Sequence, residues 1–68
     1  MKRDLSVNRQ VARLLEERKM STVRLAVLTG IPYEHLCRIL RGAQPVYADE
    51  LQPLARALGV SVENLLEL

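Results

Sequence analysis

Side chains that could carry out chemistry are concentrated in one short stretch, GIPYEHLCRILRG, which spans residues 30–42. Its centre contains a carboxylate, an imidazole and a thiol, those of Glu34, His35 and Cys37. A cysteine near a histidine can act as a nucleophile with its base, and all three groups can bind zinc. A tyrosine and two arginines stand in the same stretch. A surface that contacts another molecule is therefore the third interpretation.

The spacing argues against the first two interpretations. His35 and Cys37 are two positions apart in what the pattern predicts to be a helix, so their side chains do not share a face. One cysteine and one histidine also fall short of the ligand set of a structural zinc site. We therefore expect no enzyme activity, no metal and no cofactor. Cys37 is expected to be a small side chain at the surface, with redox sensing as a lesser alternative.

Length and composition limit what this stretch can belong to. Sixty-eight residues fit one domain, residues 1–68, and with 49% apolar residues but no Phe or Trp the core must be mostly Leu, Val, Ile and Ala. No apolar run reaches the ~18 residues of a membrane span, and MKRDLSV lacks the apolar stretch of a secretory signal. Cys37 is the single cysteine. No internal disulfide can form, and we expect a cytoplasmic protein.

The net charge of +2 conceals an asymmetry. Residues 1–42 carry nine Lys/Arg against four Asp/Glu, a balance of +5, whereas residues 43–68 carry one Arg against four acidic residues, a balance of −3. A positive and a negative end on one small body favour a polyanionic partner that approaches from one side. Ordinary solvated surface charge explains the same numbers.

Hydrophobic spacing and breaker residues predict five short helices, an all-α domain. Apolar residues recur at i, i+4, i+7 and i+8 from Val7, and Ser6 is a plausible N-cap. Pro53 lacks an N–H and should lie in or just after the first turn of its helix, which favours a late start. The predicted helices run from about Val7 to Arg18, from Ser21 or Thr22 to Thr29, from Pro32 to Leu40 or Arg41, from Ala48–Glu50 to before Gly59, and from the cap Ser61 through Leu66.

The second and third predicted helices are separated only by Gly30 and Ile31. So short a link prevents antiparallel packing and predicts a steep crossing, a helix-turn-helix over about residues 21–41. The side chains expected to point inward are Leu25, Ala26, Leu36 and Ile39. The opposite face of the third helix would then present Tyr33, Glu34, Cys37, Arg38 and Arg41.

Three segments, LAVLTGIPYEHLCRILRG, LARALGVS and VENLL, resemble the phage-repressor-like (Cro/XRE-type) helix-turn-helix family. The resemblance covers about residues 7–67. It implies a compact five-helix, lambda-repressor-like domain whose third helix enters the major groove of double-stranded DNA while the second lies across the backbone. It further implies a small transcriptional regulator of repressor type, located with the nucleoid, that binds palindromic operators as a dimer.

Position in the family motif also implies the contacting residues. Arg38 could hold guanine through two hydrogen bonds. Glu34 could accept one from cytosine, although stabilising the helix N-terminus or pairing with Arg38 explains it slightly better. The residues expected to contact bases are Tyr33, Glu34, Cys37, Arg38 and the loop residue Gln44. Those expected near phosphates are Thr22, His35, Arg41, Arg9 and Arg24.

The chain departs from the family pattern at two places. Leu15 and Leu40 stand where the family often has a buried Arg–Glu pair. Because both members of the pair are replaced by leucine, no unpaired charge is left buried, and we expect the two leucines to touch in the core. Val23 and Val27 occupy usually polar positions and could form an exposed strip. Either a partner or second subunit contacts this strip, or Leu5 and its neighbours fold over it.

A homodimer is expected because one helix contacts too few base pairs for selectivity. The family often pairs through the fifth helix, which makes Val62 and Leu68 the candidates for the dimer seam. A rival hypothesis keeps the fold but not the DNA: an antirepressor, regulatory subunit or antitoxin-type module that binds protein. Glu34 and the modest net charge favour the rival, whereas the +5 balance of residues 1–42 favours DNA.

Overall fold

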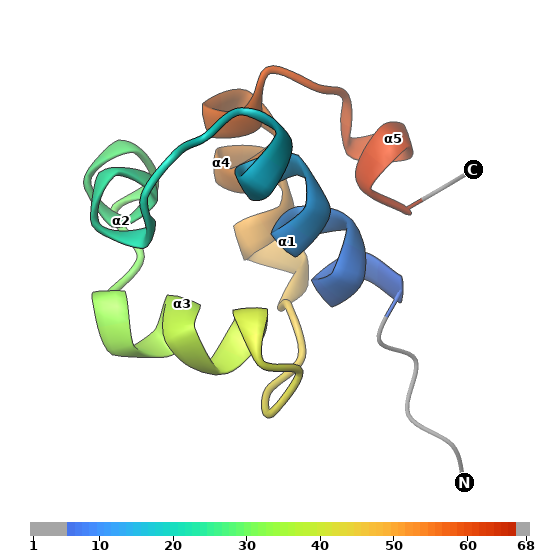
Figure 1. Cartoon of the computed structure of the whole chain (residues 1–68). Helices are drawn as coiled ribbons and strands as arrows, with labels where there is room; N and C mark the ends of the chain where they lie inside the picture. Colours follow the sequence, from blue (N-terminus) through green and yellow to red (C-terminus); the bar gives the residue numbers. More distant parts are fainter. Residues whose placement is uncertain (1–5, 67–68) are drawn as a thin grey trace, which may run out of the picture.

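The computed structural model describes residues 6–66, and within that range the chain forms helices and no strand. The all-α fold class predicted from hydrophobic spacing is therefore confirmed. Figure 1 shows the five helices surrounding a common centre. They are α1 (Ser6–Glu17), α2 (Thr22–Thr29), α3 (Tyr33–Leu40), α4 (Ala48–Leu58) and α5 (Val62–Leu66).

Local capping signals set most helix ends. The Ser21 hydroxyl accepts a hydrogen bond from the Arg24 N–H (3.0 Å) at the start of α2, and the Ser61 hydroxyl accepts one from the Asn64 N–H (3.0 Å) at the start of α5. Gly30 ends α2 in the left-handed region (φ 77°), a conformation that a side chain would strain. These expected ends are confirmed.

Three predicted ends shift slightly. Ser6 is the first residue of α1 and not the residue before it, and α1 stops at Glu17, one residue early. Pro32 precedes α3 as its N-cap, with ψ at 141°, and Tyr33 is the first helical residue. Proline fixes φ but provides no capping side chain, so it fits on either side of a helix start.

The start of α4 lies at the early limit of the expected range, so the late start favoured by Pro53 is wrong. The helix begins at Ala48, which places Pro53 in its second turn. A local contact explains why: the Glu50 carboxylate accepts a hydrogen bond from the Tyr47 N–H (2.8 Å), the glutamate half of a capping box. This bond fixes the beginning of α4 independently of the proline.

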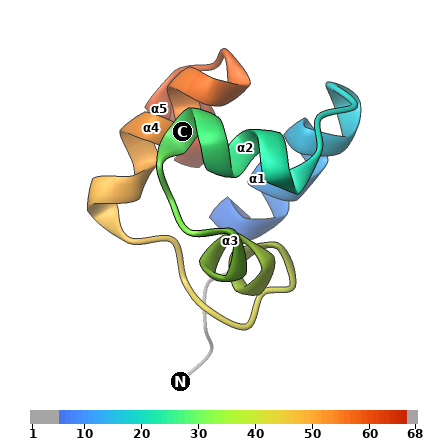
Figure 2. The ribbon, with the colours of Figure 1, turned by 90° about the vertical axis from the view of Figure 1, so that its left-hand side faces the viewer.

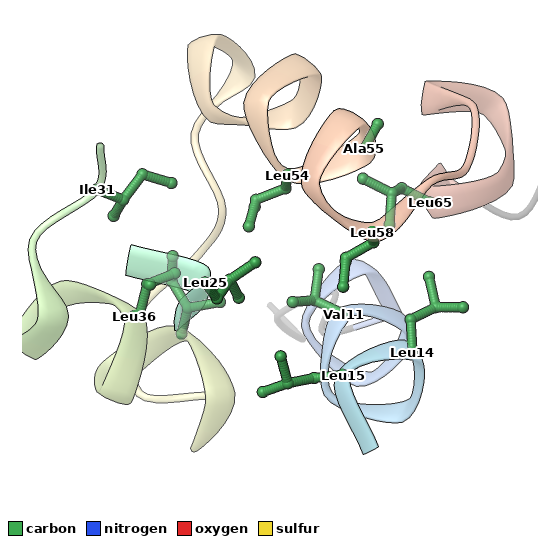
Figure 3. Close-up of a cluster of buried hydrophobic side chains, with 11 residues drawn as sticks. Val11, Leu14, Leu15, Leu25, Ile31, Leu36, Leu54, Ala55, Leu58 and Leu65 are labelled. Atoms are coloured by element: carbon green, nitrogen blue, oxygen red, sulfur yellow. The ribbon is translucent and has the colours of Figure 1, made fainter. Parts of the chain in front are cut away.

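Aliphatic side chains from all five helices form one core (Figure 3). Burying each leucine completely contributes about 1.5–3 kcal/mol. Leu15 is buried, and Leu40 is partly buried against the same cluster, so both point inward as expected; their direct contact stays a prediction. The buried apolar residues are Val11, Leu14, Leu15, Leu25, Ile31, Leu36, Ile39, Leu54, Ala55, Leu58 and Leu65.

The packing leaves one flank of α3 uncovered. α2 packs on α3 and α4, while α1 packs on α3, α4 and α5. In Figure 1 α3 lies along the lower edge of the domain, and in Figure 2 it is seen nearly end-on with α2 running across above it. The steep crossing predicted for the helix-turn-helix is therefore present, and α3 turns one side towards solvent.

Candidate nucleic-acid interface

The outward side of α3 carries the set of polar side chains expected there. Tyr33, Glu34 and Arg38 are exposed, as is Arg41 at the helix end, and Cys37 is half-buried. The alternate side of the helix is apolar and completely buried, as expected for a helix with one face in the core. The predicted orientation of α3 is confirmed. What these side chains contact stays a prediction.

Tyr33 and Cys37 lie one turn apart on this face. A side-chain hydrogen bond with Cys37, together with the charge interaction between the two groups, raises the pKa of Tyr33 above its ordinary value. The phenol is therefore a neutral hydrogen-bond donor at physiological pH. A neutral donor suits a phosphate oxygen or a base acceptor on this face.

Arg38 is held by the loop that follows α3. Its Nε donates a hydrogen bond to Gln44 Oε1 (2.8 Å). The alternative ion pair with Glu34, one turn earlier, is not formed. The Glu34 carboxylate lies in the first turn of α3, where its negative charge interacts favourably with the helix dipole. The terminal nitrogens of Arg38 form no hydrogen bond within residues 6–66.

The His35 side chain is turned towards the protein and not towards solvent. Its side chain is only 13% exposed, and its ring stacks on that of Tyr47 with centroids 5.8 Å apart. Nδ1 lies 2.9 Å from Gln44 Nε2, and Nε2 lies 2.6 Å from Glu50 Oε2, a close polar contact without the geometry of a hydrogen bond. Both ring nitrogens face protein groups. The expected phosphate contact by His35 stays a prediction that this geometry does not favour, because α4 and the loop cover the ring.

The Gln44 side chain is likewise turned towards protein groups. The side chain is engaged at both ends of its amide: Oε1 accepts from Arg38, and Nε2 lies near His35 and 3.3 Å from the Tyr47 hydroxyl. The geometry does not support the base contact expected of Gln44. Its polar atoms face the protein.

Four residues expected near phosphates remain available. Thr22 is half-buried at the first position of α2, and the side chains of Arg9, Arg24 and Arg41 are exposed. Within residues 6–66 none of these arginines forms an ion pair. Arg13, by contrast, lies 2.6 Å from Glu17, so its charge is compensated. Uncompensated arginines are suited to a polyanion.

Sequence reasoning missed Asn8. This side chain in α1 is 3% exposed, and its Nδ2 donates hydrogen bonds to the carbonyls of Ile39 (2.9 Å) and Gln44 (2.8 Å). It thereby ties α1 to the end of α3 and to the following loop. A signal existed: Asn8 precedes Val11 and Leu15 by three and seven positions, and so lies on their inward stripe.

The two expected association surfaces have different outcomes. Val23 and Val27 are 60% and 77% exposed, and Leu28 beside them is 48% exposed, so the strip on α2 is present. Leu5, the alternative cover, lies outside the described residues. On α5, Val62 is half-buried against the core, and Leu68 lies outside the described residues.

The site is convex. The described surface contains no pocket, and no group of three or more His, Cys, Asp or Glu in residues 6–66 could hold a metal ion. No helix in that same range is both long and apolar enough to cross a bilayer. A protruding helix with polar and cationic side chains can insert into the major groove, whose width accepts an α-helix.

Comparison with known families agrees with this geometry. A family described as the Cro/C1-type HTH DNA-binding domain matches residues 10–68. No curated protein matches the chain significantly, and no solved structure does. The family match spans both helices of the crossed pair and the helices after it. The chain belongs to the Cro/C1-type helix-turn-helix family of DNA-binding domains.

Proposed function

We propose that the chain is a small transcriptional regulator, of repressor type, that binds specific double-stranded DNA by inserting α3 into the major groove. The observation that carries this proposal is the uncovered side of α3, where Tyr33, Glu34 and Arg38 are exposed on a helix anchored by buried leucine and isoleucine. In this arrangement Arg38 contacts guanine, and the half-buried Cys37 packs against the base edges.

Exposed arginines around α3 supply affinity that does not depend on sequence. Arg24 belongs to α2, Arg41 ends α3, and Arg9 belongs to the first turns of α1. Asn8 bonds α1 to the end of α3, so this part of α1 stands beside the same helix. We infer that these three arginines and Thr22 contact phosphates, which hold the helix in register while base contacts select the site.

We further propose that two copies act together on a palindromic operator. A single α3 spans a few base pairs, whereas a two-fold pair doubles the contacted sequence. Val62 on α5 is the proposed seam, together with Leu68. Replacing Leu68 with Asp should lower both the mass measured by light scattering and the affinity for the operator. An unchanged mass and affinity would reject this seam.

The decisive experiment is selection of bound sequences from random duplexes, followed by a salt titration. A palindromic consensus would establish specificity and symmetry together. Affinity for the selected duplex should fall steeply with salt, and each phosphate contact removed should reduce the slope of log affinity against log salt by about one. Arg24→Ala and Arg41→Ala should each do so. Arg56→Ala, in the last turn of α4, is the matched control and should not.

The second candidate is a protein-interaction module. The exposed apolar strip of Val23, Val27 and Leu28 favours it. Apolar side chains that are grouped at a surface are shielded from water only when a partner molecule covers them. The two candidates differ in the salt titration. A chain that binds no duplex even at low salt, and whose mass changes when Val23 and Val27 are replaced by Ala, would favour the protein-binding alternative.

A further inference from the structure

A chain of polar contacts runs from the start of α4 to the outward side of α3. Glu50 Oε2 lies 2.6 Å from His35 Nε2. His35 Nδ1 lies 2.9 Å from Gln44 Nε2, and Gln44 Oε1 accepts from Arg38 Nε at 2.8 Å. The Tyr47 ring covers His35, and its hydroxyl lies 3.3 Å from the Gln44 amide nitrogen. The cluster joins two helices and the loop between them.

The hydrogen-bonding chemistry of these groups determines which atom donates and which accepts in each contact. A guanidinium can only donate, so the Gln44 atom that faces Arg38 must be the carbonyl Oε1. The amide nitrogen of Gln44 must then donate to His35 Nδ1, which accepts only when it carries no proton. In the neutral ring the proton is therefore on Nε2, facing the Glu50 carboxylate. Arg38 thus determines the orientation of the Gln44 amide, and the amide in turn selects the tautomer of His35.

This arrangement uses the atoms that Gln44 would need to contact a base. Even its main-chain carbonyl accepts a hydrogen bond, from Asn8. We propose that Gln44 is a positioning residue: supported by His35 and Glu50, it holds Arg38 in the orientation that meets the DNA base, and it contacts no base itself. This inference rests on the proposed function, because it assigns Arg38 to a base pair.

The hold on Arg38 also limits how it can bind. With Nε engaged by Gln44, the two terminal nitrogens remain as the pair that can donate, side by side, to O6 and N7 of guanine. A long side chain that is already restrained loses less conformational freedom when it binds. The selected operator should therefore contain a G·C pair at the position that Arg38 contacts, and discrimination there should depend on Gln44.

A double-mutant cycle tests the proposal on the full chain and the selected duplex. Arg38→Ala should lower affinity about 5- to 150-fold, the value of a two-bond arginine–guanine contact. Gln44→Met keeps the side-chain length but removes the amide. It should relax preference at the same base pair, and in the Arg38→Ala background it should change affinity less than about twofold, since the two residues act as one unit. Gln52→Met, at an exposed glutamine of α4, is the control.

Each outcome decides the matter. If Gln44 contacts a base, the two substitutions multiply in effect and alter preference at different base pairs, which overturns the proposal. If Gln44→Met does not fold, His35→Phe takes its place: it retains the stacked ring, removes both nitrogens, and should relax discrimination at the base pair of Arg38, whereas unchanged discrimination refutes the proposal. A wild-type chain that binds no duplex rejects the proposed function, and this is seen before any variant is compared.

Discussion

Two glutamines, Gln10 and Gln44, each form a hydrogen-bonded cluster with an arginine, and the two clusters differ in what neutralises that arginine. Gln10 in α1 accepts hydrogen bonds from Nε and Nη2 of Arg13 (3.2 and 2.8 Å) and donates to Asn64 of α5. Gln44 in the loop after α3 accepts from Arg38 and has an imidazole on its other side. Each glutamine thus links one arginine to a second element.

The difference is in what neutralises the arginine. Arg13 Nη1 lies 2.6 Å from Glu17, so the positive charge in the α1–α5 cluster is compensated by a carboxylate. Arg38 has no carboxylate partner within residues 6–66, and its terminal nitrogens face solvent. The first cluster joins two helices. The second joins two helices and also presents a restrained cation, which is the arrangement a base contact requires.

The two clusters should differ most in the stability that is lost when the asparagine bonded to each is replaced. Asn8→Ala removes two hydrogen bonds from a buried site and leaves the Gln44 carbonyl without its partner, so it should lower the free energy of unfolding by about 2–3 kcal/mol. Asn64→Ala, at an exposed position, should cost less than about 1 kcal/mol. Urea unfolding followed by circular dichroism measures both. Equal losses would mean that the two clusters stabilise the fold alike.

The two arginines should differ in binding as the two asparagines differ in stability. Arg38→Ala should weaken binding to the selected duplex by about 1–3 kcal/mol, whereas Arg13→Ala should change it by less than about 0.5 kcal/mol, because its charge is already compensated. Fluorescence anisotropy at one fixed salt concentration compares them. If Arg13→Ala weakens binding as strongly, the α1–α5 cluster also faces the DNA, and the two clusters do not differ in DNA binding.

Local signals explain why the helices and the outward side of α3 were predictable. A glycine in the left-handed region, a serine cap and an apolar repeat each act within a few residues of Gly30, Ser21 and Val11. The partners of Asn8 and His35 were not predictable, because they are distant in sequence and only the packing of α1, α3 and α4 brings them together. The surroundings of His35 and Gln44 differ from those expected for the same reason: position in the family motif places a residue along the chain, but the neighbouring elements decide which way its side chain turns.

The ion pair that closes the first cluster should contribute little stability. Arg13 and Glu17 are about half exposed, so Glu17→Gln should change the free energy of unfolding by less than about 0.5 kcal/mol, since solvent and salt screen the pair. It should nevertheless release the charge of Arg13. We expect a small rise in affinity for random duplex at low salt, with no change in the preferred sequence. A change in sequence preference would show that this cluster takes part in base recognition.

The smallest effect concerns the other half of the outward side of α3. The pKa of Tyr33 is raised above its ordinary value, chiefly by hydrogen bonding to Cys37, so the phenol loses its proton only at a pH above that of a free tyrosine. Cys37→Ala should shift the titration of Tyr33 to lower pH, measured by absorbance in a Tyr47→Phe background so that one phenol reports. Since Tyr33 is exposed, stability should not follow this shift.

Binding should lose affinity as the phenol ionises, because a phenolate neither donates a hydrogen bond nor approaches a phosphate without repulsion. In Cys37→Ala that loss should begin at lower pH, and a pH profile identical to that of the wild type would remove Tyr33 from the contact surface and leave Arg38 as the principal base contact.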